Sequence, residues 1–341
     1  MLGHILMTAV NAVLPIVLLI LLGYWLRQKN FLNDTFIKTG NALVFNICLP
    51  CMLFINVYDI QTMAGIPWGT VIYSLCAIVV LFLVGLGIAL VGTKDPDRRG
   101  VLWQCVFRSN YAIIGLPLTA ALGGEAAVSV SAIVAALAIP LFNTFAVIAL
   151  SVFKQDAKGN KTSAGSVLLG IVKNPLIIGV ALGLVCLGIR ALQVHFFGEA
   201  VFALNRELKF LHSVIDKLNA LTTPLALVVL GGQFKFSVVG GMIKEITIGT
   251  VSRIVLAPVL CIGGAVLLSK TTGLIDCGPD TVPALLCLFG TPVAVSSAVM
   301  ASQMDGDEQL ATQLVVWTSV GSVFTIFALV CVLMATGLLA V

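Results

Sequence analysis

Charged residues are scarce in this chain. Only 10% of its 341 residues are Asp, Glu, Lys or Arg, 59% are hydrophobic, and the mean hydropathy is +1.11. In soluble globular domains about a quarter of the residues are charged, so this composition excludes that class. The chain is predicted to be an integral membrane protein. Its net charge of +4 mainly reflects membrane topology, and no nucleic-acid partner is implied.

Acidic residues and histidine are missing from the middle of the long hydrophobic runs. Carboxylates inside the membrane commonly relay protons in transporters, so the sequence offers no obvious coupling group. The coupling ion, H+ or Na+, is left open. A phosphate-binding loop is missing as well, which argues against an ATP-driven pump, and no organic cofactor is expected.

A disulfide framework and a metal site are also missing. All nine cysteines except Cys277 fall inside apolar runs, where cysteine behaves as a small buried hydrophobic residue. Cys48 and Cys51 have the spacing of a redox or metal-binding pair. No second pair and no nearby histidine accompany them, so we expect neither function.

The motif of an intramembrane aspartyl protease is incomplete. Such enzymes hold two aspartates close enough to share a proton, and the dipeptides that end in Asp59 and Asp307 come nearest to this pattern. Asp59 falls at the outer end of its run, and Asp307 falls in a connection. Met304 stands where these proteases require glycine. No enzymatic activity is predicted.

Hydrophobic runs of helical length dominate what is present. Each run is about twenty residues long, which is the length of an α-helix that crosses a bilayer, and the alternation typical of outer-membrane barrels is not seen. We therefore predict an all-α polytopic membrane protein with about ten transmembrane helices. The runs lie at residues 6–26, 39–57, 68–92, 101–122, 127–153, 166–189, 213–232, 243–268, 281–303 and 310–338.

Basic residues are concentrated in alternate connections. Lys and Arg occur in the first, third, fifth and seventh connections, whereas the second and fourth connections and both tails carry none. Because basic loops remain in the cytoplasm, both termini are predicted to lie outside the cell inner membrane. The first run has no charged segment before it and no cleavage site, so we expect it to be retained as a span.

The polar loop 154–165 divides the chain into halves, residues 1–153 and 166–341, with five predicted spans each. An odd number of spans means that a duplicated half must be inverted relative to its twin. This arrangement is typical of many secondary transporters. The sequence thus predicts a five-plus-five inverted repeat.

Interruptions occur at corresponding places in the two halves. Gly115-Leu-Pro117 in the fourth span corresponds to Gly290-Thr-Pro292 in the ninth, and Pro50 in the second corresponds to Pro224 in the seventh. Isolated Pro and Gly residues often only kink a transmembrane helix. Paired interruptions instead indicate a substrate site, and we predict that these spans are broken.

The fourth span carries the costliest residues. Inserting Arg108 near the bilayer centre costs about 2.5 to 3.5 kcal/mol of free energy, and Gly115 lowers helix stability by about 1 kcal/mol. Pro117 removes a backbone hydrogen-bond donor. Freed backbone groups at this depth are tolerated only inside protein or beside a watery cavity. We therefore place a transport pathway here.

New half-helices are predicted to start at Thr223-Pro224 and Thr291-Pro292, where an N-cap residue precedes a proline at the first helical position. Such helix starts attract anions. Polar side chains near the interruptions would complete a site for a carboxylate or a dehydrated cation. They are Asn46, Asn110, Ser296, Ser297 and Gln303.

Two arginines fall within spans. Arg108 lies about 10 Å from the cytoplasmic start of its span and could extend to the interface, whereas Arg253 lies about 15 Å deep and could not. Either one could clamp a carboxylate with two hydrogen bonds, or bind helix-end carbonyl groups as a structural anchor. Both alternatives remain open.

Three segments together resemble the auxin efflux carrier family, in particular its bacterial members, and the resemblance covers almost the whole chain. They are 46–54 (NICLPCMLF), 108–117 (RSNYAIIGLP) and 290–325. The resemblance implies a secondary transporter of organic anions. Plant members export the auxin indole-3-acetate, and bacterial members are linked to malonate, malate and similar carboxylates.

The resemblance also implies a fold like that of sodium/proton antiporters, in which the fourth and ninth spans cross at mid-membrane and the protein works as an elevator. Spans 1, 2, 6 and 7 would form a scaffold that makes a homodimer, and spans 3–5 and 8–10 would move. Asn110, Pro117 and Pro292 match the crossing of the family.

The leading hypothesis is alternating-access transport of a small mono- or dicarboxylate through the lipid membrane. Asn110 and Thr291 would donate hydrogen bonds to the anion, and Arg108 or Arg253 would supply charge. One alternative is a sodium-coupled symporter of a larger amphipathic anion. Another is a membrane sensor that binds the same ligand without moving it.

Overall fold

Helices account for nearly all of the regular structure. The computed structural model describes residues 2–59, 67–153, 165, 169 and 172–339, and these residues contain no β-strand. The predicted linker 154–165 lies outside the described residues except for its last one. The only strand-like contact in the described ranges is an isolated antiparallel bridge between Ser109 and Val293.

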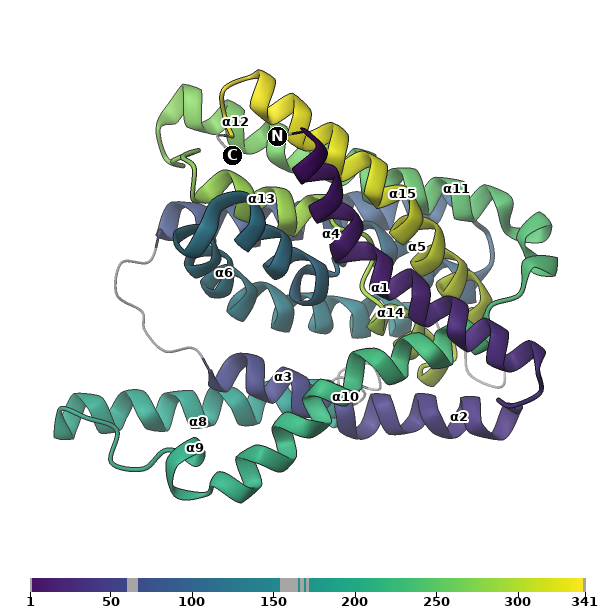
Figure 1. The fold of residues 1–341 in the computed structure, drawn as a ribbon, viewed down its shortest axis with the longest axis horizontal. Helices are drawn as coiled ribbons and strands as arrows, with labels where there is room; N and C mark the ends of the chain where they lie inside the picture. The colour runs from purple at the N-terminus through teal and green to yellow at the C-terminus, as the bar shows by residue number, and fades with distance from the viewer. Residues whose placement is uncertain (1, 60–66, 154–164, 166–168, 170–171, 340–341) are drawn as a thin grey trace.

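The helical elements follow one another along the chain, with short π-helical or 3-10 turns (η) between some of them (Figure 1). In chain order they are α1 (Leu2–Gln28), α2 (Asp34–Leu43), η1 (Val44–Cys48), α3 (Leu49–Tyr58), α4 (Trp68–Gly92), α5 (Pro96–Phe107), η2 (Tyr111–Gly115), α6 (Leu116–Val152), α8 (Pro175–Phe197), α9 (Leu204–Glu207), α10 (Lys209–Gln233), η3 (Phe236–Met242), α11 (Ile243–Val251), η4 (Ser252–Leu256), α12 (Ala257–Thr272), α13 (Thr281–Gly290), α14 (Ser296–Gln303) and α15 (Glu308–Ala335).

Seven helical segments in the described part of the chain are long and apolar enough to cross a membrane. They are Asp34–Tyr58, Trp68–Gly92, Leu118–Val152, Pro175–Phe197, Lys209–Gln233, Phe236–Thr272 and Glu308–Ala335. Two shorter apolar helices, Leu14–Gln28 and Thr281–Gly290, accompany them. The prediction of an all-α polytopic membrane protein is confirmed.

Local sequence explains where several helices begin. The side chains of Asn33, Asp95, Asn174 and Asp307 each accept a hydrogen bond from a backbone N–H in the first turn of α2, α5, α8 and α15, respectively. These caps satisfy donors that the helix itself leaves free. Gly124, with φ 66°, bends α6 and separates the predicted fourth and fifth spans.

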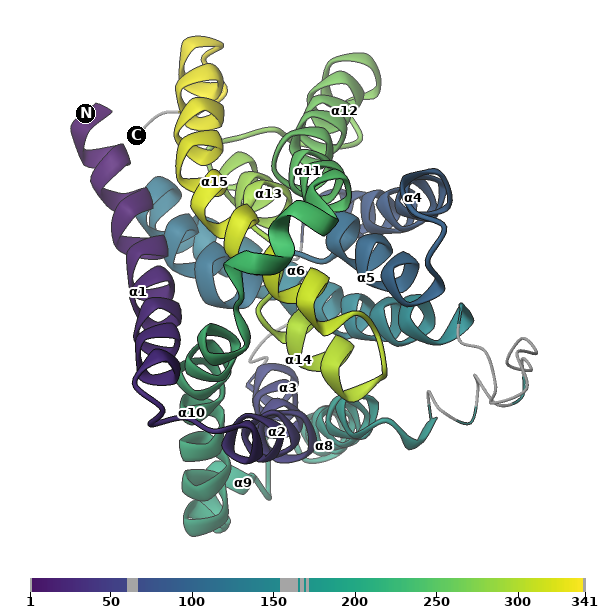
Figure 2. The ribbon, with the colours of Figure 1, turned by 90° about the vertical axis from the view of Figure 1, so that its right-hand side faces the viewer.

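The helices form two groups that lie side by side (Figures 1 and 2). In the first group α3 packs against α8 and α10, and α1 packs along α10. The second group contains α4, α5, α6, α11, α12, α13 and α15. α1 also contacts α15, and α14 contacts α2 and η1, so these helices link the groups.

Glycines allow the helices of the first group to approach closely. A Cβ atom on Gly23 of α1 would lie 2.0 Å from the carbonyl oxygen of Val228, and one on Gly231 of α10 would lie 2.0 Å from that of Ile20. Small residues are enriched at such crossings in membranes because helix association there depends on close packing. The α1–α10 contact therefore has little room for side chains.

The fourth span is broken, but not at the predicted place. α5 ends at Phe107, the chain is extended at Arg108, and helical structure resumes at Tyr111. The helix then runs on through Pro117, which occupies the first turn of α6 after a π-helical turn. Proline is tolerated in a first turn, which is why Gly115-Leu-Pro117 does not break the span.

Two further predicted breaks are wrong. α10 is continuous from Lys209 to Gln233, so no half-helix starts at Thr223-Pro224. Pro50 lies in the first turn of α3, directly after the π-helical turn η1, and the segment Asp34–Tyr58 remains one span. A π-helical turn locally adjusts the ladder of hydrogen bonds where proline lacks a donor. Pro50 therefore alters the backbone hydrogen bonding locally without breaking the helix.

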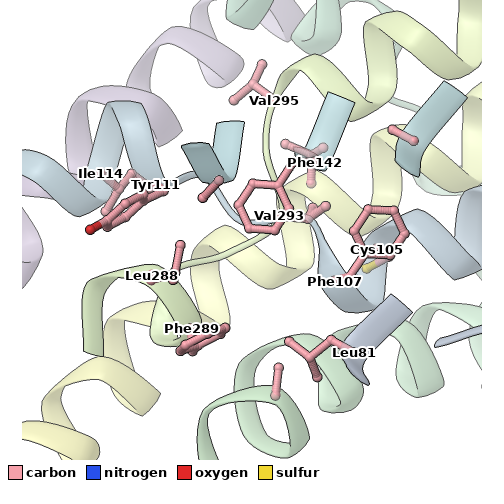
Figure 3. Packing of buried hydrophobic residues seen from close by; sticks show 14 of the residues in the cluster. Leu81, Cys105, Phe107, Tyr111, Ile114, Phe142, Leu288, Phe289, Val293 and Val295 are labelled. Carbon is pink, nitrogen blue, oxygen red and sulfur yellow. The ribbon is translucent and has the colours of Figure 1, made fainter. Parts of the chain in front are cut away.

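The break in the ninth span is confirmed, because α13 ends at Gly290 and α14 begins at Ser296. Thr291 is not the N-cap of a new half-helix, however. It caps the C-terminus of α13, and its hydroxyl donates back to the carbonyl oxygen of Cys287. Apolar side chains from both breaks, including Phe107 and Val293, belong to one buried cluster (Figure 3).

Candidate functional site

The two breaks lie against each other. The backbone N–H of Asn110 donates to the carbonyl oxygen of Pro292 at 2.8 Å, and Ser109 pairs with Val293. Two short extended segments from distant parts of the chain are thereby joined in antiparallel fashion. Backbone groups that a helix would otherwise satisfy find partners here, which explains how both breaks persist at depth.

Arg253 holds the helix ends that lead into the breaks. Its guanidinium nitrogens donate to five backbone carbonyl oxygens at 2.8–3.3 Å, and the side chain is 0% exposed. The acceptors are Val106, Phe107, Leu288, Phe289 and Thr291. These carbonyl groups lie at the C-terminal ends of α5 and α13, where the helix dipole is negative. Of the two alternatives for Arg253, the geometry supports the anchor.

Arg108 has a different environment. Its guanidinium contacts Asn143 Oδ1 at 2.7 Å, Ser296 Oγ at 2.8 Å and Met300 Sδ at 2.6 Å, and Gln104 Oε1 at 3.4 Å. The side chain is only 3% exposed. Within the described ranges no ion pair includes it. A buried guanidinium with only neutral partners favours an anion nearby.

A small cavity of about 40 Å³ lies beside Arg108. Asn110 and Ser109 line it, and among the described residues Asn110 Nδ2 and Ser109 Oγ are buried without a hydrogen-bond partner. Ser296 and Asn143 complete its polar wall, and the apolar wall comes from Leu49, Met52, Leu53, Ala112, Ile113, Ile139, Phe142 and Ala294. A positive charge and unused donors thus converge on a space the size of one carboxylate group.

A larger cavity of about 400 Å³ lies next to the small one, because Ala112 and Ile139 line both. It lies between α3 and α6, at the junction of the two helix groups. Its other lining residues are Asn56, Asp59, Leu116, Ser129, Ala132, Ile133, Ala135 and Ala136. The mainly apolar larger cavity therefore adjoins the space beside Arg108.

Asp59, just after the end of α3, is the one acidic residue among those that line this cavity. Partial burial is the main cause that raises the pKa of its carboxyl group. His212 and Arg190 lower that pKa and Asp216 raises it. The aromatic ring of Tyr58 lies 6.0 Å from the His212 ring and 5.4 Å from the Arg190 guanidinium, so α3, α8 and α10 meet here.

The structure brings only some of the predicted site residues together. Arg108, Asn110 and Ser296 line the small cavity. Thr291 is fully buried, and its hydroxyl bonds to Cys287 instead. Ser297 is buried behind the cavity, where its carbonyl oxygen accepts from Gln104 Nε2 at 3.1 Å. Pro292 contributes its carbonyl oxygen to the crossing rather than to the cavity.

Gly115, Asn46 and Pro50 serve packing in this arrangement. A Cβ atom at Gly115 would lie 2.4 Å from the Tyr111 ring, so glycine permits the turn to close. Asn46 and Pro50 lie in a different cavity, of about 420 Å³, between α3, α8 and α10, and the Asn46 amide bonds to the carbonyl oxygen of Ala42. They do not meet Arg108.

Several lining residues were not predicted from the sequence. Ser109 follows the highlighted Arg108 directly, and Asn143 is a lone amide in an otherwise apolar run, which is itself a signal of function within a membrane. Asn56 and Asp59 stand near the end of their run, so they resemble ordinary boundary residues. Over the described ranges, no group of three or more His, Cys, Asp or Glu side chains is placed to hold a metal ion.

Comparison with known proteins identifies the family of this chain. Residues 8–330 match the family described as membrane transport protein. The chain is also similar to an uncharacterized transporter of Methanocaldococcus jannaschii, with 26% identity over 249 residues that cover 70% of this chain and 75% of that protein. The resemblance noted in the sequence is confirmed over nearly the whole chain. The protein belongs to the membrane transport protein family of the auxin efflux carriers.

Proposed function

We propose that this protein is a secondary transporter of a small organic anion that carries a carboxylate group. One observation carries the proposal: Arg108 is buried beside a small cavity with only neutral partners, and Asn110 offers an unused donor to the same space. A carboxylate would neutralise the guanidinium and accept both donors, and such charge-assisted hydrogen bonds are the strong ones.

The small cavity recognises the carboxylate group. Because it is only about 40 Å³, the remainder of the ligand extends into the larger cavity. The chemistry at Arg108 alone does not choose between monocarboxylates and dicarboxylates such as malonate or malate. Arg253 does not take part in binding in this proposal, because its donors are used by helix-end carbonyl groups.

Alternating access would follow from the two groups of helices. The first group, with α1, α3, α8 and α10, would serve as a scaffold and as the surface of a homodimer in the inner membrane. The second group would carry the anion as an elevator. In support, the larger cavity lies between the groups at the Asp59 end, which the distribution of basic residues predicts to be the outer end.

Contacts at the opposite end support an outward-facing arrangement. Asn41 of α2 donates to Ser302 Oγ of α14 at 3.3 Å, and Ser302 donates to Glu308 of α15 at 2.8 Å. This chain of hydrogen bonds joins the scaffold to the second group on the proposed cytoplasmic side. Its rupture would accompany the inward movement of the second group.

A second candidate function is sodium-coupled symport of a larger amphipathic anion. The apolar lining of the larger cavity favours it, because a long hydrocarbon body would be buried there. The two candidates share the anion site, but the second takes a larger anion and requires sodium. Uptake into sealed vesicles under an imposed H+ or Na+ gradient separates them.

Thermal stabilisation of the purified protein by a panel of carboxylates tests the shared anion site. A ligand that binds the folded state raises its melting temperature by mass action. The Asn110→Ala variant loses one charge-assisted hydrogen bond worth about 1.5 to 3 kcal/mol, so we expect roughly 10- to 150-fold weaker binding. Unchanged affinity in a folded Asn110→Ala protein would contradict the proposal.

A further inference from the structure

The larger cavity has few side chains that could stabilise a second charged group of a bound ligand. Most of its wall is apolar, with Leu116, Ile133 and Ile139 as the bulkiest side chains. Only Asn56, Asp59 and Ser129 contribute polar side chains, and no Lys, Arg or His is among the described residues that line the cavity. A second carboxylate in this space would lose water without a hydrogen bond from a cationic side chain of the cavity lining.

Asn56 and Asp59 form a polar pair at the far end of this cavity. They lie three residues apart at the end of α3, and therefore on one face of the helix. Asn56 Nδ2 is buried and finds no acceptor among the described residues, whereas an ionised Asp59 only accepts. A donor and an acceptor placed together match a hydroxyl group, which can accept from the first and donate to the second.

The distance between the two ends sets the length of the ligand. Leu53 of α3 lines the small cavity, and Asp59 lies six residues further along the chain. At the helical rise this separation is about 9 Å. A carboxylate beside Arg108 and a hydroxyl beside Asp59 would thus be joined by an apolar body comparable to an extended six-carbon chain.

We propose that the cavity selects organic monocarboxylates with an apolar body and an uncharged hydroxyl-type group at the far end, and that Asn56 and Asp59 are the residues that determine this specificity. The inference rests on the proposed anion site at Arg108 and narrows its substrate class. Asp59 has two tasks. It accepts a hydrogen bond from the distal group, and it repels a distal carboxylate.

The repulsion has a size that an experiment can resolve. Two negative charges about 6 Å apart at an effective dielectric constant of about 40 weaken binding on the order of tenfold. His212 and Arg190 partly offset the charge of Asp59, and Asp216 adds to it, so these groups must be kept constant in the comparison. A neutral, isosteric substitution at Asp59 alone meets this condition.

The test compares hexanoate, 6-hydroxyhexanoate and adipate, which share one chain length and differ only at the far end. Dissociation constants are measured at pH 7.5 by thermal stabilisation of the full-length protein. We expect 6-hydroxyhexanoate to bind most tightly and adipate about tenfold more weakly than hexanoate. In Asp59→Asn, the affinity for adipate should increase about tenfold while the affinity for hexanoate stays unchanged. Glu125→Gln removes an exposed acidic side chain that does not line the cavity, so the dissociation constants of all three acids should stay the same.

Two further variants test the site from other directions. Ser129→Lys places a cation on the cavity wall, so adipate should now bind better than hexanoate. Asn56→Leu keeps the volume but removes the donor, and the preference for 6-hydroxyhexanoate over hexanoate should disappear.

Equal affinity for all three acids in the wild type, unaltered in Asp59→Asn, would overturn this inference and leave the Arg108 site intact. If none of the three acids stabilises the wild-type protein, the inference and the proposed anion site both fail. Loss of all three shifts in Asn110→Ala, together with the expected order in the wild type, supports both.

Discussion

Arg108 and Arg253 show that two buried arginines of one chain can have opposite tasks. Arg253 is surrounded by carbonyl groups of the main chain, whereas Arg108 faces side chains and a cavity. In the proposed function, the Arg253 guanidinium stabilises the fold and the Arg108 guanidinium binds the ligand. Substitutions at the two positions should therefore separate stability from binding.

Arg253→Gln should destabilise the protein without a specific loss of affinity. Five carbonyl oxygens lose their donor, and unsatisfied buried groups cost about 1 to 3 kcal/mol each, so a loss of at least about 3 kcal/mol is expected. Melting temperature and yield in detergent measure it. Arg253→Lys, which keeps the charge but has three donors, should lie between wild type and Arg253→Gln.

Arg108→Gln should have the complementary phenotype. Removing the charge leaves a bound carboxylate without its cation, which weakens binding by about 2 to 5 kcal/mol, or roughly 30- to 5,000-fold. Stability of the unliganded protein should change little or increase, since an unpaired buried charge is removed. A normal dissociation constant in this variant would assign Arg108 to structure.

Glycines set the spacing of helices α1 and α10. Gly23→Ala and Gly231→Ala each place a methyl group about 2.0 Å from a backbone oxygen, so we expect losses of about 1 to 3 kcal/mol or more. Gly188→Ala in α8 is the matched control, because nothing lies within 4 Å of the new Cβ atom. It should be neutral or stabilising by up to about 1 kcal/mol. Equal melting temperatures for all three variants would rule out this packing.

Hydrophobic run length predicted the helices well, because spanning a bilayer requires about twenty apolar residues whatever the packing. The positions of the breaks were harder to predict. Pro50, Pro117 and Pro224 all lie in continuous helical segments, and only Pro292 lies in a break. Proline fits a first turn, a π-helical turn or a kink equally well, so the residue type alone does not locate an interruption.

The residues that line the proposed anion site could be identified from the sequence only in part. Arg108 and Asn110 are conspicuous because polar residues are costly within an apolar run. The anchoring role of Arg253 depends on carbonyl groups of residues as far away as Val106, 147 positions earlier. Such contacts exist only once the two breaks meet. The sequence shows which charged residue is unfavourable to bury within the membrane. It does not show the distant carbonyl groups that offset the free energy of that burial.

The proposed movement of one helix group against the other predicts that a bridge across the cytoplasmic contact stops transport. The side chains of Asn41 and Ser302 lie within 3.3 Å of each other, so cysteines at both positions should be cross-linked by Hg2+. Cross-linking should abolish uptake in vesicles while ligand binding persists. The two single-cysteine variants control for the nine native cysteines, and full transport by the cross-linked protein would refute the movement.

Arg108 also has an electrical consequence. If the second helix group crosses the membrane with the anion, the empty and loaded forms differ by one elementary charge, because a bound monocarboxylate cancels that of the guanidinium. The membrane voltage then changes the free energy of movement for the empty, charged form but not for the loaded, neutral form. The difference is about 2.3 kcal/mol per 100 mV if the charge crosses the whole field. A buried cation without a carboxylate partner would thus make the resting potential of the cell a part of the transport cycle.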